Sequence, residues 1–107
     1  MAEQDYRRDW YNLLSKEDIL RAIRLFDAVG YAVFNKRTGF LVSTDFIRYK
    51  DRPYDCKSIM VGAYLLKFDK PNHHFKQTEI ADLLPLLSSF NFVVERRVVG
   101  SYWPVSE

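Results

Sequence analysis

The sequence predicts an α+β fold, in which two helix–β-hairpin units form a mostly antiparallel sheet with the helices on one face. One observation is that residues 16–44 align with residues 77–105 without a gap. A second is that both stretches show the same order of patterns: an amphipathic helix, an alternating segment, a tight turn that ends in Gly39 or Gly100, and a second alternating segment. The alignment has two explanations, an internal repeat or a chance likeness of patterns, and each unit is predicted from its own periodicity under either one.

The first unit begins with a helix over residues 16–29. Ser15 is a typical N-cap residue, and Asp18 three positions later has the spacing of a capping box. Gly30 is a typical residue after the last turn of a helix. Apolar residues recur at helical spacing and form one stripe: Ile19, Ala22, Ile23, Phe26 and Val29.

A hairpin is predicted to follow this helix. Its strands cover residues 31–35 and 40–44, and Tyr31 is expected in the core. The turn between them ends in Gly39, which we expect at a positive φ because glycine adopts that conformation without steric cost.

The second unit has the same predicted order. A helix over residues 78–90 is followed by strands over residues 92–96 and 101–105, with Phe92 in the core. Pro85 lies inside the predicted helix, where it either kinks the helix or marks a break. The second unit is therefore expected to be less regular than the first.

The remaining segments are less regular in pattern. Residues 6–14 are expected to form a short helix, and residues 45–56 a loop or a ragged strand. Residues 57–68 are apolar on all sides and could form a central helix or a buried strand. Asp55 as an N-cap favours the helix, whereas Gly62 weakens both interpretations.

Composition limits the class of protein. A chain of 107 residues is expected to form a single domain over residues 1–107. A net charge of +2 neither requires nor excludes nucleic acid as a partner. We expect a cytoplasmic protein that does not enter the membrane. The sequence shows no leader peptide, and the longest apolar run, residues 59–66, is too short to span a bilayer.

The residues capable of catalysis do not form a recognisable motif. Cys56 is the single cysteine, and no family signature or evident base accompanies it. His73 and His74 are neighbours in a turn, and adjacent side chains do not converge on one metal ion as a spaced pair would. We therefore predict no catalytic residue, no metal site and no cofactor, and hence a protein that is not an enzyme.

Basic and aromatic residues at the predicted hairpins are the candidate contact residues. Two basic pairs lead into the turns, and two aromatic residues follow on the last strand: Lys36, Arg37, Arg96, Arg97, Tyr102 and Trp103. Aromatic residues and arginine dominate the binding energy of many protein interfaces. Basic hairpin tips beside aromatic residues can also contact phosphates and stack on bases.

The sequence thus leaves two functions open. The first is a small regulatory module that binds a protein partner, with homodimer formation as one form of that contact. The alternative is a nucleic-acid-binding domain, since helix–strand–turn–strand is also the order of the second half of a winged helix.

Overall fold

The structure is a computed structural model that describes residues 7–39 and 43–96. Its elements in chain order are η1 (Trp10–Leu13), α1 (Lys16–Val29), α2 (Tyr31–Thr38), β1 (Asp45–Tyr49), β2 (Arg52–Asp55), α3 (Cys56–Phe68), η2 (Phe75–Gln77), α4 (Ile80–Ser89) and β3 (Val93–Arg96). The strands form an antiparallel sheet in the order β2-β1-β3. The predicted α+β class, with helices packed on an antiparallel sheet, is confirmed.

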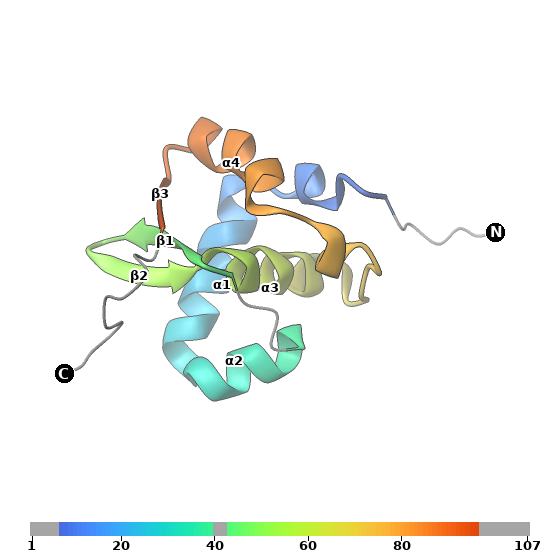
Figure 1. Cartoon of the computed structure of the whole chain (residues 1–107). Coiled ribbons are helices and arrows are strands. Elements are labelled where there is room, and N and C mark those ends of the chain that lie inside the picture. The colour runs from blue at the N-terminus through green and yellow to red at the C-terminus, as the bar shows by residue number, and fades with distance from the viewer. Residues whose placement is uncertain (1–6, 40–42, 97–107) are drawn as a thin grey trace.

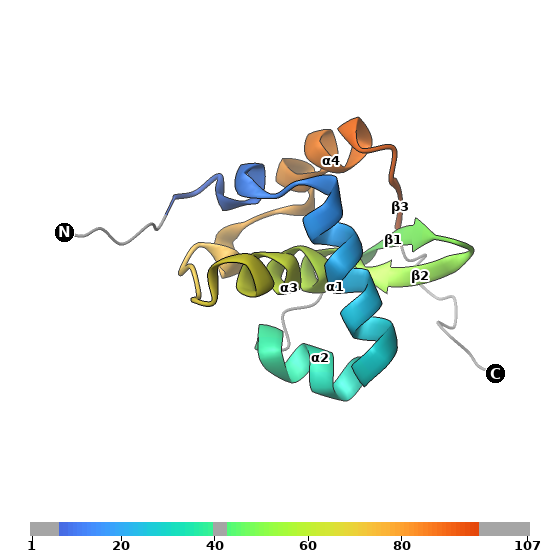
Figure 2. The same cartoon turned by 180° about the vertical axis from the view of Figure 1, so that it is seen from behind.

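Helix α3 lies at the centre of the fold (Figure 1). Helix α1 crosses it, helix α2 lies on one side of it and α4 on the other, and the sheet lies beyond one end of α3 (Figures 1 and 2). Helix α3 contacts α1, α2, β1 and β2, so its apolar surface is covered on several sides. This explains why residues 57–68 are apolar all round, and the helix favoured by the Asp55 cap is confirmed: Asp55 accepts a hydrogen bond from Ser58 N at 2.9 Å.

Helix α1 begins as predicted. The Ser15 hydroxyl accepts from Asp18 N at 3.2 Å, and the Asp18 carboxylate accepts from Ser15 N at 2.8 Å, which completes the capping box. Lys67 Nζ of α3 lies 3.0 Å from the same carboxylate. The N-terminus of α1 is thereby joined to the last turn of α3.

The predicted strand over residues 31–35 is wrong, because this segment belongs to helix α2. Phe34, Asn35 and Thr38 are buried at helical spacing, whereas Tyr31 is 60% exposed and is not a core residue as expected. The alternating pattern of residues 31–35 is therefore the edge of a short amphipathic helix. The two aligned stretches do not share one architecture, since the described part of the second stretch continues as a strand. Residues 40–42 of the predicted second strand lie outside the described residues.

Gly39 does have the expected positive φ, at 77°, but as the C-cap of α2 rather than in a hairpin turn. The hairpin lies later, in the segment expected to be a loop or a ragged strand. Strands β1 and β2 pair from Phe46↔Asp55 to Tyr49↔Arg52, and Lys50 and Asp51 both take a positive φ in the two-residue turn. This is the backbone of a type I′ turn, without the Asn-Gly or Asp-Gly signature that identifies such turns in sequences.

Helix α4 continues through Pro85 instead of breaking there. Pro85 and Ala81 are both exposed, so water can solvate the Ala81 carbonyl that the missing proline N–H would have bonded. Asn91, with φ 68°, follows the helix, and β3 then confirms the predicted strand over residues 92–96, with Phe92 buried. The turn ending in Gly100 and the strand over residues 101–105 lie outside the described residues.

An aromatic cluster joins the N-terminal segment to the core. The Trp10 ring is completely buried and meets the Phe75 and Tyr64 rings edge-on, at centroid distances of 4.9 and 5.5 Å. Residues 6–14 were expected to be helical, and η1 supplies a single 3₁₀ turn there. None of the described helices has the length and apolar character needed to cross a membrane.

Candidate functional site

The structure distributes the predicted contact residues over separate elements. Lys36 and Arg37 are exposed in the last turn of α2, not at a hairpin tip as predicted. Arg96 is exposed at the end of β3, with its Nε 3.9 Å from the Asp45 carboxylate. Three of the predicted contact residues lie outside the described part of the chain: Arg97, Tyr102 and Trp103.

Most arginines of α1 and the sheet are paired with acidic residues. Arg24 lies 2.7 Å from Glu17, and Arg48 lies 2.7 Å from Glu95 across the β1–β3 pair. Arg52 lies 3.3 Å from Asp27. These pairs neutralise much of the positive charge at the hairpin and along α1.

Several cations form no ion pair within residues 7–39 and 43–96. Four of them lie at the end of α2 and in residues 70–76, and we call these four the basic surface: Lys36, Arg37, Lys70 and Lys76. Its two parts lie side by side, because Thr38 and Gly39 at the end of α2 and Lys76 of η2 line the same open hollow of about 500 Å³. Asn72, His73 and Phe75 complete that hollow. Four cations without a carboxylate partner among the described residues therefore lie at the end of α2 and in residues 70–76.

Hydrogen bonds fix the segment that carries Lys70 and Lys76. The buried Asn72 donates to the Arg7 carbonyl at 3.1 Å and accepts from His74 N at 2.8 Å. Lys57 Nζ lies 3.4 Å from the Lys76 carbonyl, and burial lowers the pKa of that ammonium, against the opposing charges of Glu79 and Asp55. The basic surface is thus built on a backbone with defined partners.

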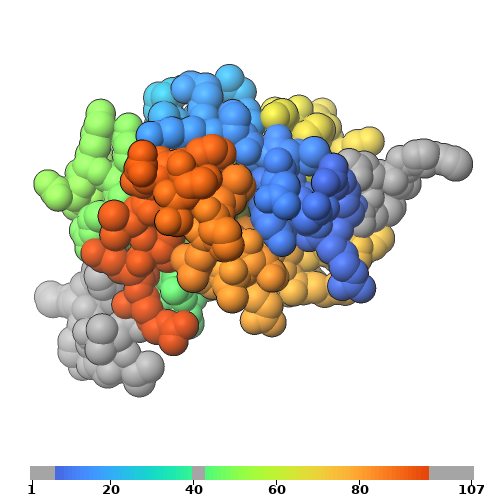
Figure 3. Space-filling view, turned by 90° about the horizontal axis from the view of Figure 1, so that it is seen from above, coloured from blue at the N-terminus to red at the C-terminus, as the bar shows by residue number. Residues whose placement is uncertain are grey.

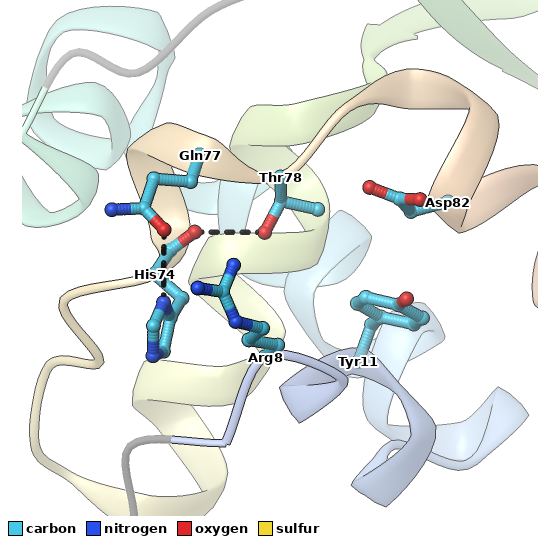
Figure 4. A pocket seen from close by; sticks show the side chains of 6 residues that line it. All are labelled: Arg8, Tyr11, His74, Gln77, Thr78 and Asp82. Carbon is cyan, nitrogen blue, oxygen red and sulfur yellow. Dashed lines mark hydrogen bonds between the residues drawn. The ribbon is translucent and has the colours of Figure 1, made fainter.

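A polar pocket of about 220 Å³ lies next to the basic surface. It is lined by six residues of the N-terminal segment and of the segment from η2 to α4: Arg8, Tyr11, His74, Gln77, Thr78 and Asp82 (Figure 4). The two segments also lie side by side in the space-filling view, with the N-terminal segment in blue and α4 in orange (Figure 3). The pocket therefore depends on the packing of η1 against the 74–82 region.

The walls of the polar pocket are held in place. Thr78 Oγ1 accepts from Trp10 Nε1 at 2.9 Å and donates to the His74 carbonyl at 2.8 Å. His74 Nδ1 lies 3.0 Å from Gln77 Oε1, within hydrogen-bond distance. On the other side, Asp82 accepts from Glu79 N at 3.0 Å in the capping box of α4.

The polar pocket contains both signs of charge. Arg8 and His74 lie on one side in Figure 4, and Asp82 and Tyr11 on the other. Arg8 forms no ion pair within the described ranges. Burial, together with the charges of Asp82 and Asp9, raises the pKa of Tyr11, so its hydroxyl keeps its proton at neutral pH and can donate a hydrogen bond.

The thiol that the sequence singled out is completely buried. Burial, and then the negative charges of Asp55 and Asp45, raise the pKa of Cys56 to about 12. The thiol is therefore protonated at neutral pH, and the reactive thiolate is not formed. The His73 and His74 rings have centroids 4.4 Å apart and are tilted by 56° to each other. In the described part of the chain no three metal-ligating side chains converge.

Sequence reasoning missed the polar pocket and half of the basic surface. Arg8 and Tyr11 are far in sequence from Asp82, and no periodic pattern predicts that they meet. Lys70 and Lys76 are single lysines in a turn region, without the run of basic residues that marks a binding segment in a sequence. The approach of Arg8 and Tyr11 to Asp82 depends on the packing of the buried Trp10 against Thr78, which is a tertiary interaction.

The fold and these surfaces define a small α+β domain with a basic surface beside a polar pocket. The family model for the "ScoMcrA-like, N-terminal head domain" matches residues 12–96. The chain belongs to this family. Neither a curated protein nor a solved structure matches it significantly.

Proposed function

We propose that this chain is a DNA-contacting head domain of a restriction or modification protein, and that it holds DNA phosphates with the basic surface. The family description supports a small domain of a DNA-related protein. Of the two functions that the sequence left open, this match favours nucleic acid. We further propose that this domain has a non-enzymatic accessory role and that other domains perform any cleavage or modification; the description of the family as a head domain supports this.

The observation that carries the proposal is the contrast between paired and unpaired cations. Arg24, Arg48 and Arg52 already have carboxylate partners, so binding a phosphate would require them to give these up. Lys36, Arg37, Lys70 and Lys76 have no such partner among the described residues and are exposed. They can replace the counterions of a phosphate backbone directly, which gives sequence-independent, salt-dependent binding.

The proposal is tested by fluorescence anisotropy with a labelled DNA duplex over a series of salt concentrations. A variant that changes all four residues of the basic surface to glutamine is compared with the wild type. Each lost phosphate contact is expected to lower the slope of log K against log salt by about one. The matched control changes Arg24, Arg48 and Arg52 to glutamine and is expected to keep most of the slope. Equal slopes for wild type and the basic-surface variant would contradict the proposal.

A specific observation also favours the second candidate, contact with a protein or with another copy of the chain. The corner between α1 and α2 exposes three apolar side chains: Val29 at 36%, Tyr31 at 60% and Val33 at 54%. Exposed aromatic and aliphatic side chains of this kind are typical of interface centres. Sedimentation equilibrium of wild type and a Tyr31→Ala, Val33→Ser variant tests self-association: a dimer that the variant loses would support this candidate.

A further inference from the structure

We propose that the polar pocket takes a single unstacked guanine base from the nucleic acid that the basic surface holds. This inference rests on the proposed function, because the basic surface would supply the strand. The pocket, with Arg8 on one side and Asp82 on the other, would then read the base.

The opposed charges of the pocket exclude the simplest ligands. A free anion would meet the Asp82 carboxylate, and a free cation would meet the Arg8 guanidinium. The arrangement instead suits a neutral ligand with hydrogen-bond acceptors at one edge and donors at another. Arg8 can only donate, and the Asp82 oxygens can only accept, so each selects one of these edges.

Guanine has this distribution of polar groups. Its O6 and N7 atoms are acceptors that pair with an arginine fork, and its N1–H and N2–H groups are donors that suit a carboxylate. Adenine and cytosine each present a single exocyclic amino group to a carboxylate and would leave one of its oxygens without a partner. The Asp82 carboxylate can accept the two guanine N–H groups, because the only hydrogen bond to Asp82 in the described chain is the one from Glu79 N.

The remaining walls fit a flat aromatic ligand. The Tyr11 ring packs edge-on against Trp10 at a centroid distance of 5.6 Å, and the bond to Gln77 fixes the His74 imidazole. Stacking of a base on an aromatic side chain contributes about 1–3 kcal/mol and tolerates any base, so it adds affinity while the polar edges add specificity. The side chains that hydrogen bonds hold in place, those of Thr78, His74 and Asp82, lose little entropy on binding.

The position of the pocket agrees with this role. His73 and Lys76 line the hollow beside the basic surface, while their neighbours His74 and Gln77 line the polar pocket. A strand whose phosphates contact Lys76 would therefore carry a base close to the pocket. Because a paired base must first be unstacked, a guanine in single-stranded or mismatched DNA is expected to enter more easily than one in a perfect duplex.

The test uses labelled single-stranded oligothymidylate with one central guanine, inosine or adenine, measured by anisotropy with the full chain. Guanine is expected to bind about tenfold more tightly than adenine, and inosine, which lacks the N2 amino group, is expected to lie between them. Arg8→Gln and Asp82→Asn are each expected to abolish the preference for guanine. Asp82→Asn keeps a side-chain oxygen for Glu79 N, so the cap of α4 is retained. Arg21→Gln removes a cation of α1 that does not line the pocket, and is expected to keep the preference.

The outcomes separate the two proposals. DNA binding without any preference for guanine, or a preference that survives both pocket variants, would overturn the pocket assignment and leave the proposed function standing. Binding of free guanosine monophosphate that both variants abolish, with no binding of DNA, would contradict the proposed function but support the pocket. Absence of binding to both ligands would contradict both.

Discussion

The indole Nε1 of Trp10 donates a hydrogen bond to the hydroxyl of Thr78, 2.9 Å away and 68 positions later in the chain. Both residues are buried. The bond attaches η1 to the segment between η2 and α4, and these two segments form the walls of the polar pocket. The positions of Arg8 and Tyr11 relative to Asp82 therefore depend on this contact.

Thr78→Val is expected to destabilise the fold. Valine has a similar shape but cannot accept from Trp10, so the indole N–H would be buried without a partner, at a cost of about 1–3 kcal/mol. Urea unfolding followed by tryptophan fluorescence measures the change. Ser88→Ala, at an exposed position of α4, is the control and is expected to change the stability by less than about 0.5 kcal/mol. A Thr78→Val variant with the same free energy of unfolding as the wild type would show that the bond does not hold the two segments together.

Asp18→Asn is expected to destabilise the protein at neutral pH but not in acid. Burial alone would raise the pKa of Asp18, but hydrogen bonds from Ser15 and Lys67 outweigh it and hold the pKa below its usual value. A lowered pKa contributes stability above the unfolded-state pKa, and this contribution is lost as the pH falls through the folded-state value. Asparagine can still accept from Ser15 N, so the loss reflects mainly the missing charge beside Lys67.

The measurement is the free energy of unfolding of both proteins over a pH series. The advantage of the wild type is expected to disappear progressively as the pH falls below the ordinary carboxyl pKa of 3.8. A difference that stays constant over this range would mean that the charge of Asp18 contributes nothing.

Cys56 is expected to be unreactive and to make the fold sensitive to alkali. The pKa of the buried thiol is about 12, above its ordinary value of 9.0, so the folded state keeps the proton longer than the unfolded state. The stability of the wild type relative to Cys56→Ala should then fall by about 1.4 kcal/mol per pH unit above pH 9. A thiol reagent should modify the native protein only as fast as it unfolds. Rapid labelling of the folded protein would contradict the burial of this thiol.

Gly62→Ala is expected to destabilise the protein although alanine favours helices. A Cβ atom at position 62 would lie 2.3 Å from Cζ of Phe34, so the Phe34 ring would have to move. Overpacking of this kind costs about 1–3 kcal/mol, more than the gain of about 1 kcal/mol in helix propensity. The double variant Gly62→Ala, Phe34→Leu should lose less stability than the sum of the losses in the two single variants, because the smaller leucine side chain leaves room for the new Cβ atom. Additive costs would mean that α2 does not pack on α3 at this point.

The sequence predicted the elements whose signals are local. The Ser15 capping box, the Asp55 cap and the alternation of residues 92–96 each depend on neighbouring residues, and all three were confirmed. Residues 31–35 misled because in so short a segment the alternation of a strand and the edge of a helix look alike. The β1–β2 hairpin was missed because Lys50 and Asp51 occupy a turn normally marked by glycine.

The candidate site was predictable only in part. Lys36 and Arg37 were predicted as contact residues from their charge and belong to the basic surface, although the expected hairpin around them is a helix end. Which cations are already paired cannot be read from the chain, because Arg48 meets Glu95 and Arg52 meets Asp27 only through tertiary packing. The same holds for the polar pocket, whose walls come from the N-terminal segment and from residues 74–82.

The most direct test of the central claim is to follow the backbone amide NMR signals of the ¹⁵N-labelled chain while a short DNA duplex is added. The proposed function predicts that the largest changes occur at residues 36–39 and 70–78, where the basic surface lies, and that they weaken as salt is added. Changes confined to the hairpin at residues 48–52 or to the apolar corner at residues 29–33, or no changes at any DNA concentration, would contradict it.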